Sequence, residues 1–215
     1  MIKNIIFDFD GTLADTASLI VKTMQETIRQ MELPPKTDEE CQATIGLRLE
    51  DVPAKIWPEL GDIGSEYAQK YRTLFNELKR PFDVKMYAGV IETLRALHDR
   101  GINMAIASSR SHTSLKEYIE QFNLVECFEM LVGGNDVANG KPAPDPVLSI
   151  TDKLGWDVGE TLTVGDAAVD ILMGQAACTE TCAVTYGNGN AKELEAVHPT
   201  YIIHAFPDLL QYIGE

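Results

Sequence analysis

The chain has 215 residues, 45% of them hydrophobic, and a formal net charge of −15 at pH 7. This length exceeds one typical domain and falls short of two, so we expect a main domain that carries an insertion. The negative charge disfavours nucleic acid and anionic membrane surfaces as partners, and no Lys/Arg block reverses it locally. An anionic substrate would therefore need a local cationic site.

The N-terminus enters a strand pattern without a signal-peptide design, and no apolar run approaches the roughly 18 residues that span a bilayer. We therefore expect a cytoplasmic protein that does not bind membranes. The four cysteines include no Cys-x-x-Cys pair, which disfavours both a zinc knuckle and a disulfide framework. Nothing in the sequence indicates the oligomeric state.

The first predicted element is a buried strand at Ile5-Ile6-Phe7. Residues from about 15 to 80 then contain helical patterns and no convincing strand. Apolar residues at helical spacing predict a helix from about Leu19 to Met31, ending before Pro34-Pro35. A second helix is expected to start near Thr37, and a third to run from about Ile63 to Leu78.

From Tyr87 onward, short apolar runs alternate with helical patterns, which predicts a parallel sheet with helices on both faces. The expected strands are Ile102–Ala107, Met130–Val132, Thr161–Val164, Cys182–Val184 and Tyr201–Ile203. The expected helices are Val90–Arg100, Ser114–Phe122, Pro146–Leu154, Ala167–Ala177, Ala191–Glu195 and Phe206–Tyr212.

The fold class is thus α/β, a doubly wound, Rossmann-like parallel sheet with an all-helical insertion after the first strand. We expect a core of residues 1–14 and 84–215 and a helical cap of residues 15–83. The tethers between them would lie near Leu13–Thr16 and Lys79–Met86.

Polar residues follow several of the predicted strands. Asp8 and Asp10 follow the first, Ser108-Ser109-Arg110 follow the second, and Asp166 follows Thr161–Val164. Lys141 lies in a Gly-Lys-Pro loop before another helix. Because open parallel sheets bind ligands beyond the carboxyl ends of their strands, all of these can meet at one edge.

The carboxylates of Asp8 and Asp10, released together at the end of a strand, would need a cation between them. Like charges about 4 Å apart repel by roughly 4 kcal/mol at an effective dielectric near 20. Mg2+, which prefers carboxylate and water oxygens, is the candidate. We expect it to be held by Asp8, Asp166 and a backbone carbonyl at Asp10. Asp8 could then attack phosphorus and form an aspartyl phosphate, while Asp10 protonates the leaving oxygen and later activates water.

The remaining candidates support this chemistry. Lys141 and the Ser108 hydroxyl could hold the phosphate oxygens, and Gly11 lets the backbone approach the phosphoryl group. Asp170, one helical turn beyond Asp166, could orient Lys141 or metal-bound water. We also expect Ser109 to bind phosphate, and Thr12 to contact the metal ligands without binding the metal itself.

Together these motifs resemble the haloacid dehalogenase superfamily, in its order and spacing and across nearly the whole chain. They are Asp8-Phe-Asp-Gly-Thr-Leu-Ala-Asp-Thr, Ser108 at a strand end, Lys141 in Gly-Lys-Pro-Ala-Pro-Asp-Pro, and Val164-Gly-Asp-Ala-Ala-Val-Asp170. The helical insertion is similar to the cap of the phosphoglycolate-phosphatase-like branch, as is the segment Val184-Thr-Tyr-Gly-Asn-Gly. The resemblance implies a Mg2+-dependent phosphatase of small phosphorylated metabolites.

The chain departs from that branch at a few positions. Ser109 and Arg110 stand where its phosphatases often have Asn and Lys, which could alter the leaving-group side of the pocket. Ala167 replaces a frequent Ser or Thr after the aspartate of the fourth motif. Ile20 falls where sugar-phosphate mutases of the group usually have a histidine, which argues against a mutase.

Alternatives remain open at this stage. An inorganic pyrophosphatase, a nucleotidase or a sugar-phosphate mutase would use the same motifs, and a phospho-accepting receiver domain uses similar residues without a lid. Taken singly, Asp166 could be a helix N-cap and Lys141 a solvated lysine. Arg48 could reach from the cap to the substrate or be an exposed arginine, and a substrate contact by His112 is left open.

Overall fold

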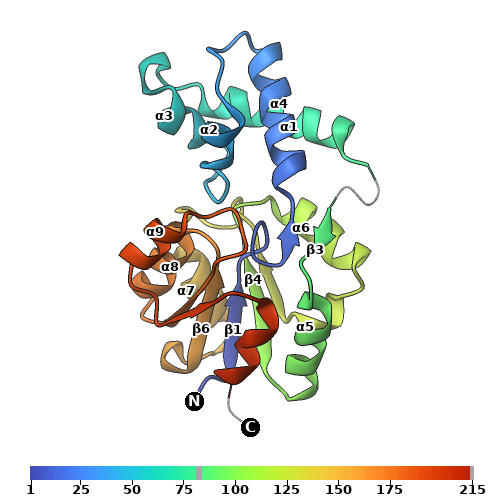
Figure 1. The fold of residues 1–215 in the computed structure, drawn as a ribbon, viewed down its shortest axis with the longest axis vertical. Helices are drawn as coiled ribbons and strands as arrows, with labels where there is room; N and C mark the ends of the chain where they lie inside the picture. Colours follow the sequence, from blue (N-terminus) through green and yellow to red (C-terminus); the bar gives the residue numbers. More distant parts are fainter. Residues whose placement is uncertain (81–83, 214–215) are drawn as a thin grey trace.

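The computed structural model describes residues 1–80 and 84–213 (Figure 1). Its centre is a six-stranded sheet in the order β5-β4-β1-β6-β7-β8, in which neighbouring strands run parallel. The strands are β1 (Asn4–Phe7), β4 (Asn103–Ala107), β5 (Met130–Val132), β6 (Thr161–Gly165), β7 (Glu180–Val184) and β8 (Tyr201–Ile203). The chain thus has the expected doubly wound α/β core.

Helices cover both faces of this sheet, as its buried strands require. Alternate residues of β1 separate the two faces: Ile5 and Phe7 belong to one buried cluster and Ile6 to another. The first face is covered by α5 (Val90–Asp99), α6 (His112–Gln121) and the 3₁₀ helix Phe206–Gln211. The second is covered by α7 (Asp145–Leu154), α8 (Ala168–Ala176) and α9 (Ala191–Ala196). Two further 3₁₀ turns are Val125–Cys127 and Val158–Glu160.

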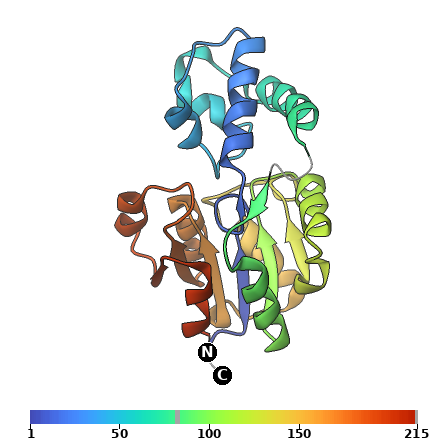
Figure 2. The same ribbon diagram turned by 45° about the vertical axis from the view of Figure 1, so that its right-hand side comes forward.

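The segment after β1 forms a separate group of helices at the carboxyl edge of the sheet (Figures 1 and 2). It comprises α1 (Ala17–Gln30), α2 (Asp38–Gln42), α3 (Val52–Ile56), the 3₁₀ turn Pro58–Leu60 and α4 (Gly64–Leu78). We call this group the cap. Among the described residues, no helix combines the length and the apolar character that crossing a bilayer requires.

Local chemistry explains the main cap helices. Thr37 caps α2 by accepting a hydrogen bond from the backbone of Glu40, whose side chain reciprocally accepts from the backbone of Thr37. On α4, Tyr67, Tyr71 and Phe75 are spaced four residues apart and stack along one buried face, with ring centroids 6.4 Å and 5.9 Å apart. This face packs against α1.

A short antiparallel ribbon joins cap and core. In it β2 (Ala14–Asp15) pairs with β3 (Lys85–Met86). The two strands lie in the expected tethers, although residues 81–83 of the second tether, including the expected boundary at residue 83, lie outside the described residues.

One local prediction needs correction, and two short elements were not expected. The segment expected as a helix at Phe206–Tyr212 is a 3₁₀ helix that begins at Phe206 and ends at Gln211. The five-residue helix α3 was not expected, because one turn and a half shows little periodicity. The ribbon was not expected either, since its two-residue strands owe their conformation to pairing between distant segments.

Candidate active site

Asp8 follows β1 and is 4% exposed. Its backbone N–H donates to the carbonyl of Val164 on the neighbouring strand, at 2.9 Å, which fixes the carboxylate at the sheet edge. Lys141, from the loop before α7, donates to Asp8 at 2.5 Å and to Asp170 at 2.7 Å. Although burial opposes it, the carboxylates of Asp170 and Asp8 raise the pKa of Lys141. The lysine therefore remains a cation in a buried site.

Asp166 lies at the end of β6 and is equally buried. One oxygen accepts from the Thr12 hydroxyl at 3.0 Å and the other from the backbone N–H of Asn188 at 2.7 Å. Burial, and next the neighbouring Asp170 carboxylate, raise the pKa of Asp166 to about 7. Burial also raises the pKa of Asp8 well above its usual range, with Lys141 opposing that shift.

The carboxylates of Asp8, Asp166 and Asp170 form a cluster in which one oxygen from each lies within 4.8 Å of the others. Lys141 is the cation that contacts two of them. Three formal negative charges facing one positive charge leave a buried excess of negative charge. Carboxylate oxygens are the ligands that hard divalent cations prefer, so this cluster fits such an ion.

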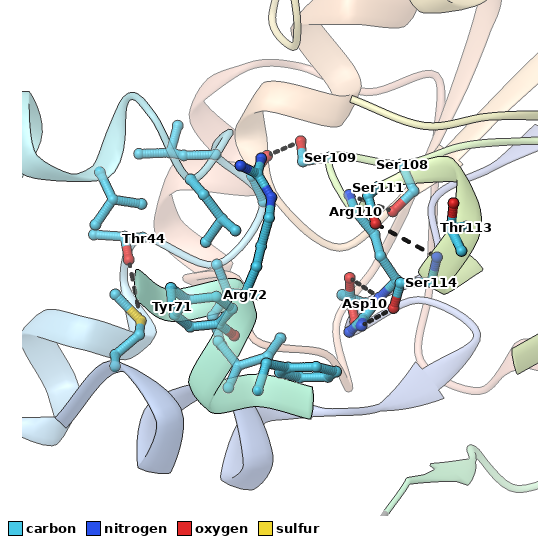
Figure 3. A pocket seen from close by; sticks show the side chains of 18 of the residues that line it. Asp10, Thr44, Tyr71, Arg72, Ser108, Ser109, Arg110, Ser111, Thr113 and Ser114 are labelled. Atoms are coloured by element: carbon cyan, nitrogen blue, oxygen red, sulfur yellow. Dashed lines mark hydrogen bonds and ion pairs between the residues drawn. The ribbon is translucent and has the colours of Figure 1, made fainter. Parts of the chain in front are cut away.

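Asp10 is paired with a different cation. Arg110 forms a fork on its carboxylate, with distances of 3.1 Å from Nε and 2.5 Å from Nη2. The two side chains are only 7% and 12% exposed. The guanidinium also lies 5.2 Å from the ring centroid of Phe75 on the cap and 4.9 Å from that of Tyr118 on the core. Figure 3 shows Arg110 directed toward Asp10.

Gly11 follows in a left-handed conformation, with a φ of 93°. A Cβ at this position would overlap the Asp166 carboxylate and approach the Asn188 amide nitrogen to 2.6 Å. Glycine is required here because the segment Gly187–Gly189 and Asp166 pack directly against the loop that follows Asp8 and Asp10.

Ser108 and Ser109, which follow β4, have different surroundings. Ser108 is buried, and its hydroxyl oxygen accepts a hydrogen bond from the backbone N–H of Arg110 at 3.2 Å. The Ser109 hydroxyl instead donates to the carbonyl of Gly46 in the cap, at 2.6 Å. In this arrangement, Ser109 joins core to cap.

Arg48 also reaches from the cap to the core. Its guanidinium donates to the carbonyl of Ala138 at 2.8 Å, and its side chain packs against Gly140, next to Lys141. His112 lies 2.7 Å from Asp136 and is about two-fifths exposed. The structure therefore places the Arg48 side chain against the loop that carries Lys141, and pairs His112 with the Asp136 carboxylate.

A cavity of about 220 Å³ lies between these core residues and the cap. Asp8, Asp10, Ser108 and Ser109 line its core side. Residues of α1, of the loop from Thr44 to Val52 and of α4 line its cap side. The carboxylates of Asp8 and Asp10 thus border a space that a small molecule can enter.

Sequence reasoning did not foresee the contacts of three residues that the structure places at this site. Arg110 was expected at this sheet edge, on the leaving-group side of the pocket, but its pairing with Asp10 has no signal in the sequence. Asn188 and Tyr186 lie in the segment noted only for its resemblance; Tyr186 donates to the Thr12 carbonyl at 2.7 Å. The buried Asn188 side-chain nitrogen has no hydrogen-bond partner within the described structure.

Comparisons with known proteins agree with this arrangement. The family model of haloacid dehalogenase-like hydrolases matches residues 5–184. The chain is 34% identical to pyrophosphatase PpaX of Bacillus pumilus over 213 residues, 99% of this chain and 97% of that protein. It is 28% identical to a phosphoglycolate phosphatase of Salmonella typhimurium over 235 residues, 99% of this chain and 93% of that one.

A solved structure from Bacteroides fragilis, described as that of a haloacid dehalogenase-like hydrolase, is also similar. It superimposes with a TM-score of 0.91 at 26% identity, covering 97% of this chain and all of the other. The family expected from the sequence motifs is therefore confirmed, together with the α/β fold. The chain belongs to the haloacid dehalogenase-like hydrolases.

Proposed function

We propose that this hydrolase, a phosphatase, cleaves small phosphorylated metabolites through an aspartyl phosphate formed on Asp8. The observation that carries the proposal is that two carboxylates, only two residues apart in the chain, are paired with different cations. Asp8 is paired with Lys141 in the buried acidic cluster, whereas Asp10 is paired with Arg110. Both border the same cavity, so one can attack phosphorus while the other serves the leaving group.

In the first step, a carboxylate oxygen of Asp8 bonds to phosphorus and the bond from phosphorus to the leaving oxygen breaks. Asp10, released from Arg110 and protonated once the substrate is bound, would donate its proton to that oxygen as the alcohol departs. In the second step, Asp10 takes a proton from a water molecule, which attacks phosphorus and releases phosphate from Asp8. Asp10 thereby returns to its protonated form, ready for the next substrate.

The phosphoryl oxygens would be held by Lys141, the Ser108 hydroxyl and the backbone around Gly11. Lys141 is well suited because Asp170 accepts a second hydrogen bond from its ammonium group, which holds that group beside Asp8. The close packing at Gly11 leaves no room for a side chain beside the phosphoryl group. We keep Ser109 as a phosphate-binding residue through its backbone, since its hydroxyl already donates to Gly46.

We further propose that Mg2+ is the metal cofactor. Asp8 and Asp166 would supply its carboxylate ligands, with a backbone carbonyl at Asp10. Asp170, in the same cluster, would orient Lys141 or metal-bound water, and Thr12 would orient Asp166 through its hydroxyl. Bound there, Mg2+ would supply the positive charge that offsets repulsion between Asp8 and an incoming phosphate.

The cap would act as a lid, which makes residues 15–83 one domain and residues 1–14 with 84–215 the other. Hydrogen bonds from Ser109 to Gly46, from Arg48 to Ala138 and from Lys79 to Glu117 cross between them. Release of these contacts would open the cavity, and their formation would exclude water. The ribbon between the two parts would absorb the motion.

An inorganic pyrophosphatase is the second candidate, favoured by the similarity to PpaX. A sugar-phosphate mutase gains no support, because Ile20 lines the cavity and can neither donate nor accept a proton. A cytoplasmic location and the lack of nucleic-acid and membrane partners remain predictions from the sequence.

The test is hydrolysis of p-nitrophenyl phosphate by purified protein. Wild type should turn over with Mg2+, lose activity in EDTA and recover it when Mg2+ is restored. Asp8→Asn, a nearly isosteric change, should fold normally by circular dichroism and show no turnover. Retained activity in Asp8→Asn would refute the nucleophile, and a rate unaffected by EDTA would refute the metal.

A further inference from the structure

The cavity beneath the cap has an asymmetric lining. Its core side carries carboxylates and hydroxyls, whereas its cap side is mainly apolar. The apolar side chains come from three separate cap segments: Ile20 and Met24 from α1, Leu47 and Leu49 from the loop after α2, and Phe75 from α4. Part of this surface is visible in Figure 3, to the left of Arg110 and Asp10.

The charged groups in the lining are already paired. Arg110 forms the fork on Asp10, and Arg72 donates to Glu50 at 2.7 Å. Glu117 accepts from Lys79 at 2.6 Å. Asp8 is bound to Lys141. Within the described part of the chain, the lining thus contains more carboxylates than guanidinium groups and no cation that lacks a carboxylate partner.

These features bear on the leaving group of the substrate. A second phosphate or a carboxylate entering this space would leave water and meet an apolar wall, with neighbouring carboxylates and no spare cation. Burial of an unpaired charge is strongly unfavourable. An uncharged apolar group would instead gain from contact with the cap. The cavity, at about 220 Å³, is also smaller than the roughly 300–1,000 Å³ that drug-sized ligands occupy, which disfavours a nucleoside.

We propose that the substrate is a small phosphate monoester whose leaving group is uncharged and largely apolar. The phosphoryl group lies against Asp8, and the alkyl part lies against Leu47, Ile20 and Phe75 of the cap. On the core side, the hydroxyls of Thr113 and Ser114 can each form one hydrogen bond with the leaving group. The inference rests on the proposed phosphatase function and goes beyond it by naming the substrate class.

Three substrates of similar size test the proposal with the wild-type protein. Isobutyl phosphate carries an apolar isopropyl group where phosphoglycolate carries a carboxylate, and pyrophosphate carries a second phosphate. The kcat/KM for isobutyl phosphate should exceed that for each of the other two by tenfold or more. Phosphate release from p-nitrophenyl phosphate shows in parallel that the phosphatase is active.

A cap variant provides a second measurement. Leu47→Arg places a cation in the apolar wall and should shift the ratio of kcat/KM toward phosphoglycolate by at least tenfold. The matched control is Leu60→Arg, on an exposed leucine of the cap outside the lining, which should leave the ratio unchanged. The wild-type comparison does not depend on whether Leu47→Arg folds.

The outcomes separate this inference from the proposed function. Turnover of p-nitrophenyl phosphate with phosphoglycolate or pyrophosphate preferred over isobutyl phosphate would overturn the apolar substrate class and leave the phosphatase intact. No release of phosphate from any substrate would overturn both.

Discussion

The ion pair between Arg110 and Asp10 makes a sharp prediction about stability. Replacing Arg110 with Met keeps an unbranched side chain against Phe75 and Tyr118 but removes the guanidinium fork. The Asp10 carboxylate, only 12% exposed, then lacks its cation. Arg110→Met should therefore destabilise the fold far beyond the loss of an ordinary surface contact.

The expected size follows from the burial of both partners. Removing one member of a buried ion pair typically costs about 3–5 kcal/mol, because the remaining charge is left uncompensated. For a chain of this length, each kcal/mol lowers the thermal midpoint by roughly 2–4 °C. The variant should thus unfold about 6–20 °C below wild type. Arg110→Lys, which keeps the charge but loses the fork, should fall between the two.

A double-mutant cycle in urea separates the pair from other effects of the substitution. Asp10→Asn removes the unpaired charge, so the double variant should lose clearly less stability than the sum of the single losses. Arg29, which forms a similar fork on Glu26 at the exposed surface of α1, is the matched control. Arg29→Met should change the midpoint little. Additive losses at Arg110 and Asp10, or equal shifts for Arg110→Met and Arg29→Met, would refute the reasoning.

Other predictions concern the metal, the glycine and the cap. Mg2+ at 100 times its Kd should stabilise wild type by about 2.7 kcal/mol, seen as a higher thermal midpoint, and Asp166→Asn should abolish this shift; an unchanged wild-type midpoint would contradict the metal site. Gly11→Ala should remove turnover of p-nitrophenyl phosphate, since its Cβ overlaps Asp166, and near wild-type rates would show that the loop can move aside. Arg48→Ala should lower kcat/KM for isobutyl phosphate more than for p-nitrophenyl phosphate, and equal losses would count against a role of Arg48 in substrate preference.

Much of the fold could be predicted from the sequence because hydrophobic periodicity is a local property. Runs such as Ile102–Ala107 and Thr161–Val164 are short and contain no charged residue, as expected for strands buried on both faces. The structure confirms the sheet that they predict. The ribbon of β2 and β3 escaped prediction because its residues become strands only by pairing with each other across the cap.

The candidate site likewise contains residues whose meeting could be predicted from the sequence and one contact that could not. Carboxylates that follow parallel strands can be expected to meet, as Asp8 and Asp166 do here. Asp170 on α8 and Lys141 in the loop before α7 join them. The roles assigned to them remain predictions. The partner of Asp10 could not be foreseen, because Arg110 is held in place by aromatic rings from α4 and α6, which only the folded chain brings together.

Arg110 connects the cap to Asp10, the proposed acid and base of the reaction. The guanidinium contacts Asp10 through hydrogen bonds and Phe75 of the cap through its ring face. Withdrawal of the cap would remove Phe75 from one side of the arginine and admit water to the ion pair. Since the attraction within an ion pair falls as the local dielectric rises, Asp10 would be held less firmly with the cap open. A closed cap would therefore hold Asp10 as the carboxylate that takes a proton from water in the second step, whereas its role as the acid of the first step would require its release from Arg110.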